Sequence, residues 1–292
     1  MPSEKIIDAF TNEYNKKYGE KPVIEKKISV SGGCINKGVG LLCAESGFFI
    51  KWNLKNAYPG MFETEAKGLK LLLKSNTLTI PRPLLCGEID EWAFIAMEFI
   101  KSAPQKPDFW ILFGQKLAAM HKHSSGFFGL EYDNYIGSLP QSNNKKHSWP
   151  EFFASERLDR LCEKAFNEGL LSSKHIRHFE SFYKKLPDIF PDEPPALLHG
   201  DLWNGNYMID KNGDACIMDP VVYYGHREMD LGMSKLFGGF AAEFYDAYHN
   251  SYPLEHGWQE RLNYCNLYPL LVHLILFGSS YRSSIDNIIN KF

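Results

Sequence analysis

Segments with β-strand character are concentrated in the first hundred residues of this 292-residue chain, and helical patterns dominate the remainder, where residues 214–220 form a short strand-like run. Residues 23–30, 37–46 and 47–53 carry β-branched and alternating apolar side chains, separated by a Gly-rich stretch and a turn. A further buried strand is predicted at residues 92–100. This distribution predicts a small antiparallel sheet followed by a larger helical region.

Helical periodicity recurs at the N-terminus, between the predicted strands and through the second part of the chain, at residues 1–14, 60–76, 108–123, 149–169 and 172–186. The Pro-containing residues 80–88 are interpreted as a link between elements. We therefore predict an α+β fold with two lobes. Residues 1–99 form a β-rich lobe with one main helix, and residues 100–292 form a mostly helical lobe.

Charge and composition argue against several classes of partner. The net charge is −3 and the Lys and Arg residues are dispersed, so nucleic acid is not an expected ligand. The longest apolar run, residues 268–278, is shorter than the ~20 residues of a membrane span. The six scattered cysteines and the absence of an N-terminal signal-peptide pattern predict reduced thiols in a cytoplasmic protein.

The stretch "LLHGDLWNGN", residues 197–206, fits neither an amphipathic helix nor an alternating strand, which predicts a loop that positions functional groups. Asp201 and Asn206 have the spacing that kinases use for the catalytic-loop Asp and the metal-binding Asn. Asp201 would accept or orient a hydroxyl proton, and Asn206 would offer a neutral oxygen to Mg²⁺. The alternative is an Asx-rich loop whose side chains cap its own backbone.

Three further features accompany this loop in the order found in kinases. Gly32 and Gly33 lie between two predicted strands, where backbone N–H groups can approach a phosphate, although most such glycines are simple turns. Lys51 ends a strand and Glu65 follows on a helix, with Glu63 as the rival partner and two solvated side chains as the alternative. Asp219 follows a short apolar run. The ordered series predicts an ATP and Mg²⁺ site.

The loop, together with "MDPVVYYGHREMDLGMSKLFGGF" at residues 218–240, resembles the fructosamine/ketosamine kinase family, which is related to aminoglycoside and choline kinases. Segments such as "GGCIN", "FIKWN", "MFETEAKGL" and "WPEFFASERL" resemble family segments in the same order, over nearly the whole chain. The resemblance implies a protein-kinase-like fold and ATP-dependent phosphorylation of a ketosamine at a sugar hydroxyl, typically O3. The phosphorylated adduct then decomposes and frees the amine, which is called deglycation.

The resemblance also implies roles for individual residues. Asp201 matches the catalytic base, and two positions match the metal ligands, Asn206 and Asp219. Lys51 and Glu65 match the phosphate-binding pair.

In the same way, Met97 matches the residue that precedes the hinge, with the backbone of Glu98 and Ile100 facing adenine. Trp203 matches a residue that stacks on the sugar adduct, and the further substrate candidates are His226 and His273.

The chain departs from the family pattern at two places. Val221 replaces a frequent Ala, and residues 273–281 are more apolar than the corresponding His- and Asn-bearing segment, of which His273 is retained. The second departure affects the expected substrate pocket and leaves the phosphoryl chemistry unaffected.

Several other residues have structural or regulatory interpretations. His121 and His123 lack nearby ligand partners, so packing roles are expected. His199 and Asp230 are expected to brace the catalytic loop. Cys34, in the Gly-rich loop, is a candidate for redox sensitivity or an intermolecular disulfide, with a small residue fitting a tight loop as the alternative.

Two other functions compete with the ketosamine kinase. An aminoglycoside or choline-type kinase would share the fold, and a pseudokinase would act as a binding module. The acceptor sugar and the amine, free or part of a protein lysine, stay open. A monomer or weak dimer without a membrane partner is expected.

Overall fold

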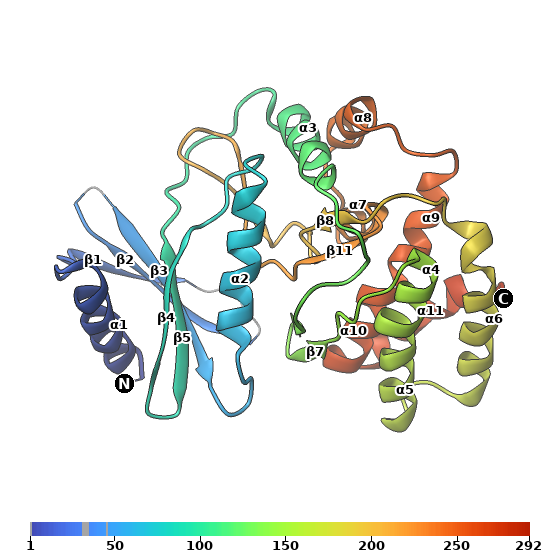
Figure 1. The fold of residues 1–292 in the computed structure, drawn as a ribbon, viewed down its shortest axis with the longest axis horizontal. Helices are drawn as coiled ribbons and strands as arrows, with labels where there is room; N and C mark the ends of the chain where they lie inside the picture. The colour runs from blue at the N-terminus through green and yellow to red at the C-terminus, as the bar shows by residue number, and fades with distance from the viewer. Residues whose placement is uncertain (1, 31–34, 45) are drawn as a thin grey trace. The chain divides into compact units, whose positions relative to one another are not determined.

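The computed structural model describes residues 2–30, 35–44 and 46–292, and it divides into two compact units (Figure 1). The first unit comprises Met1–Phe109 and Tyr207–Pro220, and the second comprises Trp110–Asn206 and Val221–Phe292. A five-stranded sheet belongs to the first unit and the second is mainly helical, which confirms the predicted α+β class.

The sheet of the first unit is antiparallel throughout, with strand order β1-β2-β3-β5-β4. The three strands predicted first are β1 (Lys26–Val30), β2 (Lys37–Leu42) and β3 (Gly47–Leu54), and the fourth is β5 (Trp92–Glu98). These predictions are confirmed. Their alternating side chains cover two faces of one sheet, as the period of a β-strand requires.

The prediction of a link at residues 80–88 was wrong, because Pro83–Ile89 forms strand β4. This strand lies at the edge of the sheet, where a proline can begin a strand without breaking an interior ladder. Pro83 pairs with Met97, and the register shifts immediately after it, between Pro83 and Leu85. The proline therefore marked the start of an edge strand.

Two helices lie on opposite sides of this sheet (Figure 1). The N-terminal helix α1 (Pro2–Tyr18) buries Ile6 and Phe10 against one face, which includes Ile50. Helix α2 (Met61–Lys74) is the predicted main helix. It begins directly after Gly60, whose own backbone has the left-handed conformation. Because side chains alternate along β3, Lys51 points to the face opposite Ile50, where α2 meets it.

A hairpin distant in sequence completes the first unit. Its strands are β9 (Tyr207–Ile209) and β10 (Ala215–Ile217), and the Ile217 N–H donates to the Thr79 carbonyl at 3.0 Å. The Thr79 hydroxyl donates to Asp210 Oδ2 at 2.8 Å. These contacts explain why residues 207–220 belong with the sheet in the structure. The functional division at residues 99 and 100 stays a prediction.

The second unit is built on helices and short strand pairs. Helices α4 (Trp149–Phe152), η1 (Phe153–Asp159, a π-helix) and α5 (Arg160–Asn167) follow one another without a break in the predicted region 149–169. The others are α3 (Phe109–His121), α6 (Ser173–Ile189), α7 (Glu228–Leu236), α8 (Ala242–Ser251), α9 (Trp258–Cys265), α10 (Leu267–Phe277), η2 (Ser279–Tyr281, a 3₁₀ helix) and α11 (Arg282–Ile289). Within the described ranges, helices that combine the length and hydropathy of a membrane span are absent.

The predicted loop follows a short buried strand in this unit. Strand β8 (Ala196–Leu198) pairs with β11 (Tyr223–Gly225), and a second hairpin joins β6 (Asn134–Ile136) to β7 (Leu139–Gln141). Residues 199–206 leave β8 in irregular conformation before β9 begins. The loop predicted at residues 197–206 is therefore confirmed for residues 199–206, whereas Leu197 and Leu198 belong to strand β8.

Candidate active site

The first unit holds a buried lysine between two carboxylates. Lys51 Nζ of β3 donates to Glu65 Oε1 of α2 at 2.7 Å and to Asp219 Oδ1 at 3.0 Å. The Lys51 and Glu65 side chains are 6% and 10% exposed, whereas that of Asp219 is 45% exposed. The structure thus pairs Lys51 with Glu65, the preferred candidate, and the ammonium meets a carboxylate that remains open to solvent.

The charge of Lys51 is stabilised by its neighbours. Burial by itself lowers the pKa of a lysine, but the Asp219 and Glu65 carboxylates offset this effect and raise the pKa of Lys51 above its ordinary value. Lys51 is therefore a fixed cation. Such a cation suits the binding of phosphate oxygens.

Asp219 has an unusual backbone conformation. Its φ is +56°, in the left-handed region that few residues other than Gly adopt, Asn and Asp being the most frequent of these. A residue held in this region costs on the order of 1 kcal/mol, and such strain is concentrated at functional sites. The conformation presents the carboxylate to Lys51 while leaving it partly exposed.

The loop of residues 199–206 lies in the second unit up to Asn206, which fixes Asp201. Asn206 Nδ2 donates to both the carbonyl oxygen and Oδ2 of Asp201, each at 2.8 Å. The Asp201 N–H donates to His199 Nδ1 at 3.2 Å. With its Nδ2 protons directed to Asp201, Asn206 has Oδ1 as the atom that could bind a cation.

Gly200 and Asp230 hold the backbone of this loop. Gly200 has a φ of +85°, and a Cβ atom there would lie 2.0 Å from the Val221 carbonyl oxygen, so a side chain cannot be accommodated. The fully buried Asp230 accepts from the His199 and Gly200 N–H groups at 2.7 and 2.8 Å. This arrangement agrees with the bracing role expected for Asp230.

His121 explains how Asp230 stays charged while buried. His121 Nε2 lies 3.1 Å from Asp230 Oδ2, and its Nδ1 lies 2.8 Å from the Tyr248 hydroxyl. Burial tends to raise the pKa of Asp230, but the hydrogen bond from His121 and the nearby His199 bring it below its ordinary value. His121 therefore has the structural role expected for it.

Asp201 lies at the wall of a small cavity within the second unit. Most of the wall is apolar or aromatic, formed by Ile136, Met229, Met233, Tyr268 and Val272. His273 also lines it, and its Nδ1–H donates to the Pro269 carbonyl at 2.7 Å, an assignment that leaves Nε2 as an acceptor. Burial lowers the pKa of His273, which favours the neutral ring. Two predicted residues, Asp201 and His273, are thus brought together.

Trp203 lies two residues beyond Asp201 and packs against an aromatic neighbour. Its ring meets Phe237 edge-on at a centroid distance of 6.0 Å, and Phe237 contacts His273 at 4.8 Å. A Cβ atom at Gly205 would lie 2.4 Å from the Trp203 ring. A side chain at Gly205 would therefore clash with the indole ring of Trp203.

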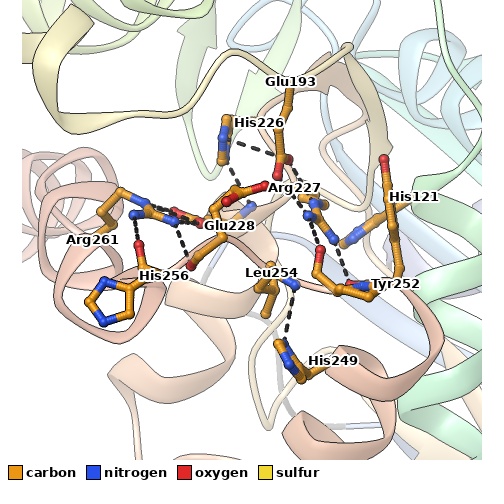
Figure 2. A network of polar contacts seen from close by, with 12 residues as sticks. His121, Glu193, His226, Arg227, Glu228, His249, Tyr252, Leu254, His256 and Arg261 are labelled. Atoms are coloured by element: carbon orange, nitrogen blue, oxygen red, sulfur yellow. Dashed lines mark hydrogen bonds and ion pairs between the residues drawn. The ribbon is translucent and has the colours of Figure 1, made fainter.

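His226 lies elsewhere, in the buried polar network of Figure 2. Its side chain is 0% exposed and packs between Trp149 and Phe190, at centroid distances of 5.8 and 5.2 Å. Its Nδ1 accepts from the Glu228 N–H at 3.4 Å, and Nε2 lies 3.7 Å from Glu193. This burial leaves His226 no surface for a substrate, so we withdraw it as a substrate residue.

The same network gives a structural role to the "GHRE" motif (Figure 2). Arg227 forms two hydrogen bonds to the Glu193 carboxylate, at 2.7 and 2.6 Å, and donates to the carbonyl oxygens of Tyr252 and Pro253. Glu228 accepts from Arg261 at 2.6 Å. The motif therefore ties the start of α7 to the segment before β8 and to α9.

We expect stability to fall as the pH is lowered because of His226. Burial lowers its pKa from 6.5 to about 4, with Arg227 and Arg261 adding to burial and Glu193 opposing it. Between these values the unfolded chain binds a proton that the folded chain does not. The free energy of unfolding should therefore drop by about 2 kcal/mol between pH 7 and pH 5 from this group. Urea titrations at both pH values measure it.

The matched variants isolate that contribution. His226→Gln should show a smaller loss between pH 7 and pH 5 than the parent, whereas the exposed His256→Gln should lose as much as the parent. An equal loss in the parent and His226→Gln would contradict the assignment.

The remaining predicted residues lie in the first unit or outside the described ranges. Met97 is buried near the end of β5, and Glu98 is exposed. The Glu98 N–H donates to the Arg82 carbonyl at 3.0 Å, so its own carbonyl is the group that could accept from an adenine amino group. Ile100 follows β5. Gly32, Gly33 and Cys34 lie outside the described residues.

Sequence reasoning missed the cavity wall contributed by α10. Tyr268, Pro269, Val272 and His273 all line the cavity, and their spacing places them on one face of a helix. His273, a polar residue within an otherwise apolar helix, was the feature of the sequence that could have indicated this wall. Tyr268, Pro269 and Val272 were not recognised, because in the sequence they look like ordinary core residues.

The side-chain oxygens of Asp219 and Asn206 are of the kind that Mg²⁺ prefers. In the part of the chain that the structure describes, no cluster of three His, Cys, Asp or Glu side chains could bind a metal ion. Mg²⁺ commonly takes one or two carboxylates with phosphate and water oxygens. Asp219, half exposed in the first unit, and Asn206, whose amide is oriented by Asp201 in the second, each offer an oxygen of that kind.

A sheet with a Lys–Glu pair, joined in one chain to a helical unit with an Asp–Asn catalytic loop, defines a phosphotransferase of the protein-kinase-like class. The spectinomycin phosphotransferase structure supports this fold, with a TM-score of 0.58 at 17% identity over 94% of this chain and 88% of that one.

The chain belongs to the fructosamine kinase family, whose model matches residues 6–292. It is 37% identical over 274 residues to a Synechocystis protein named as a ketoamine kinase, covering 92% of this chain and 90% of that one. It is 38% identical over 280 residues to the chloroplastic protein-ribulosamine 3-kinase of Arabidopsis thaliana, covering 94% and 84%. A Thermobifida fusca structure named as a fructosamine-3-kinase has a TM-score of 0.84, with 32% identity and 96% coverage of both chains.

Proposed function

We propose that this protein transfers the γ-phosphoryl group of ATP to a sugar hydroxyl, O3, of a ketosamine such as a fructosamine or ribulosamine adduct. The observation that carries the proposal is the placement of Asp201, oriented by Asn206, at the wall of a mainly apolar cavity. Family membership supports the same activity, and the named relatives act on ketoamines or ribulosamines according to their names. The phosphorylated adduct would then decompose and free its amine.

Asp201 is the proposed catalytic base. Phosphoryl transfer depends on positioning and charge neutralisation more than on covalent chemistry. The two hydrogen bonds from Asn206 fix the carboxylate, which would orient the acceptor hydroxyl and take its proton. Asp230 acts on this residue through the loop backbone, so it is a positioning residue.

Asn206 and Asp219 are the proposed ligands of Mg²⁺. When bound, the ion would neutralise charge on the β- and γ-phosphate oxygens. Lys51, held by Glu65, would bind phosphate oxygens as a fixed cation. The backbone after Met97, at Glu98 and Ile100, would receive the adenine.

Replacing Lys51 by Met should raise KM for ATP and lower kcat/KM by about 10- to 100-fold, the value of a charge-assisted hydrogen bond. Steady-state kinetics with varied ATP measure this effect. Lys55→Met is the matched control, because Lys55 follows the same strand and pairs with Glu88 at 3.0 Å. The control should keep the parent KM, and equal losses in both variants would contradict the assigned role.

Trp203 and His273 are the proposed substrate residues. A half-buried Trp beside the catalytic base can stack on a sugar or on the chain of the amine. The neutral His273 ring, whose Nδ1–H donates to the Pro269 carbonyl, can accept a hydrogen bond from a sugar hydroxyl at Nε2. Cytoplasmic location and a monomer or weak dimer stay predictions.

The proposal is tested by ADP release from Mg-ATP in the presence of individual acceptors. The panel contains ketosamines of fructose, ribulose and erythrulose, an aminoglycoside and choline. Turnover confined to ketosamines supports the proposal and ranks the sugars. Turnover confined to the aminoglycoside or choline overturns the substrate class, and ATP binding without turnover of any acceptor favours the pseudokinase.

A further inference from the structure

An aromatic surface continues outward from the catalytic cavity. Five rings lie in sequence within the second unit, and we call them the aromatic platform: Trp203, Phe237, His273, Phe277 and Tyr281. The Phe237 and His273 rings are 4.8 Å apart between centroids, and His273 contacts Phe277 at 5.3 Å and Tyr281 at 5.1 Å. Since His273 also lines the cavity with Asp201, the platform and the cavity share a residue.

The platform is accessible at its outer end. Phe277, the last residue of α10, is 50% exposed and is one of the exposed large apolar side chains of the described chain. Tyr281 and Phe237 are partly exposed residues. An exposed apolar surface that adjoins a binding cavity is typical of a ligand contact.

The described cavity wall offers the substrate one carboxylate and otherwise mainly apolar and aromatic groups. Of the described residues that line the cavity, Asp201 is the only carboxylate, and the proposed reaction uses it as a base. A secondary ammonium in the substrate would therefore lie against aromatic faces, which attract cations, and would not pair with a second carboxylate of the described cavity wall. The group beyond that nitrogen would lie along the rings.

We propose that the aromatic platform binds the amine portion of the ketosamine and selects amines that carry an apolar or aromatic group. This inference rests on the proposed function. It assigns a specificity role to Phe277 and Tyr281, while the sugar lies beside Asp201. Contact between an aromatic substituent and these rings lowers KM, because the apolar surface of both is removed from water.

The test compares two fructose ketosamines at saturating Mg-ATP, one made with 2-phenylethylamine and one with 2-aminoethanol. Both carry a secondary ammonium, and they differ by a phenyl group in place of a hydroxyl group. The parent should show a kcat/KM at least tenfold higher for the phenyl substrate, mainly through KM. Phe277→Ser and Tyr281→Ser should each reduce this preference at least threefold.

Phe166→Ser is the matched control, because Phe166 is 41% exposed on α5 and is outside the platform. This control should keep the parent preference. Equal kcat/KM for both substrates in the parent, or an unchanged preference in both platform variants, overturns the inference while leaving the proposed function intact. Failure of the parent to phosphorylate either ketosamine overturns the proposed function itself.

Discussion

Replacing Asp201 by Asn is expected to reduce kcat by about a thousandfold while ATP binding is retained. Asn has nearly the same size as Asp but cannot take a proton from the acceptor hydroxyl. General-base contributions of this kind are on the order of 10²- to 10⁴-fold. Asp201, the proposed base, lies in the second unit, and Lys51, the proposed phosphate-binding residue, lies in the first. Loss of the base should therefore affect turnover more than nucleotide affinity.

The measurement combines steady-state kinetics on a ketosamine with calorimetric titration by ATP and Mg²⁺. Asp188→Asn serves as the control, because the Asp188 side chain is 76% exposed and lies 4.0 Å from Lys185 on the surface of α6. This variant should match the parent in both measurements. A kcat above one-tenth of the parent value in Asp201→Asn would show that Asp201 is not the base.

Replacing Arg227 by Met is expected to lower the free energy of unfolding by about 3–5 kcal/mol, the cost of breaking a buried ion pair on one side. The Arg227 side chain is 4% exposed and that of Glu193 is 11% exposed. The variant would leave the Glu193 carboxylate and the carbonyl oxygens of Tyr252 and Pro253 without these donors. It would also remove the guanidinium that lies 3.8 Å from the Tyr252 ring.

Urea titration followed by circular dichroism measures this loss. Lys122→Met is the matched control, because Lys122 is exposed, lies 5.5 Å from the Tyr252 ring and donates to the Ser251 carbonyl at 3.0 Å. Its loss should stay within about 0.5 kcal/mol. The double variant Arg227→Met with Glu193→Gln should lose less stability than the two single variants lose in sum. Each single variant already removes the same ion pair, so its loss is counted once in the double variant. Simple additivity would argue against the pair.

The local pattern of the sequence predicted many elements correctly. The strands β1, β2, β3 and β5, and helix α2 between them, follow from alternation and periodicity that involve near neighbours. The prediction failed at β4, because a proline usually disfavours a strand. A proline is tolerated in an edge strand, but the sequence does not show that β4 lies at the edge of the sheet. Position in the sheet is a tertiary property.

The candidate site divides in a similar way. The order of Lys51, Glu65, Asp201, Asn206 and Asp219 along the chain was enough to predict a kinase-like site. The preference for Glu65 over Glu63 rested on resemblance, and the geometry shows the reason, since Glu65 meets Lys51 at 2.7 Å. His226 was misplaced because a motif does not indicate whether its side chain points to a pocket or into the core.

The sequence by itself determined which segments could form strands and helices and which chemical groups the chain carries, because propensity and spacing act between near neighbours. Only the tertiary structure decided which distant groups meet. Lys51 meets Asp219 across 168 residues, and His121 meets Asp230 across 109. Such contacts arise from the packing of whole elements, which buries their charges together and requires each charge to have a partner.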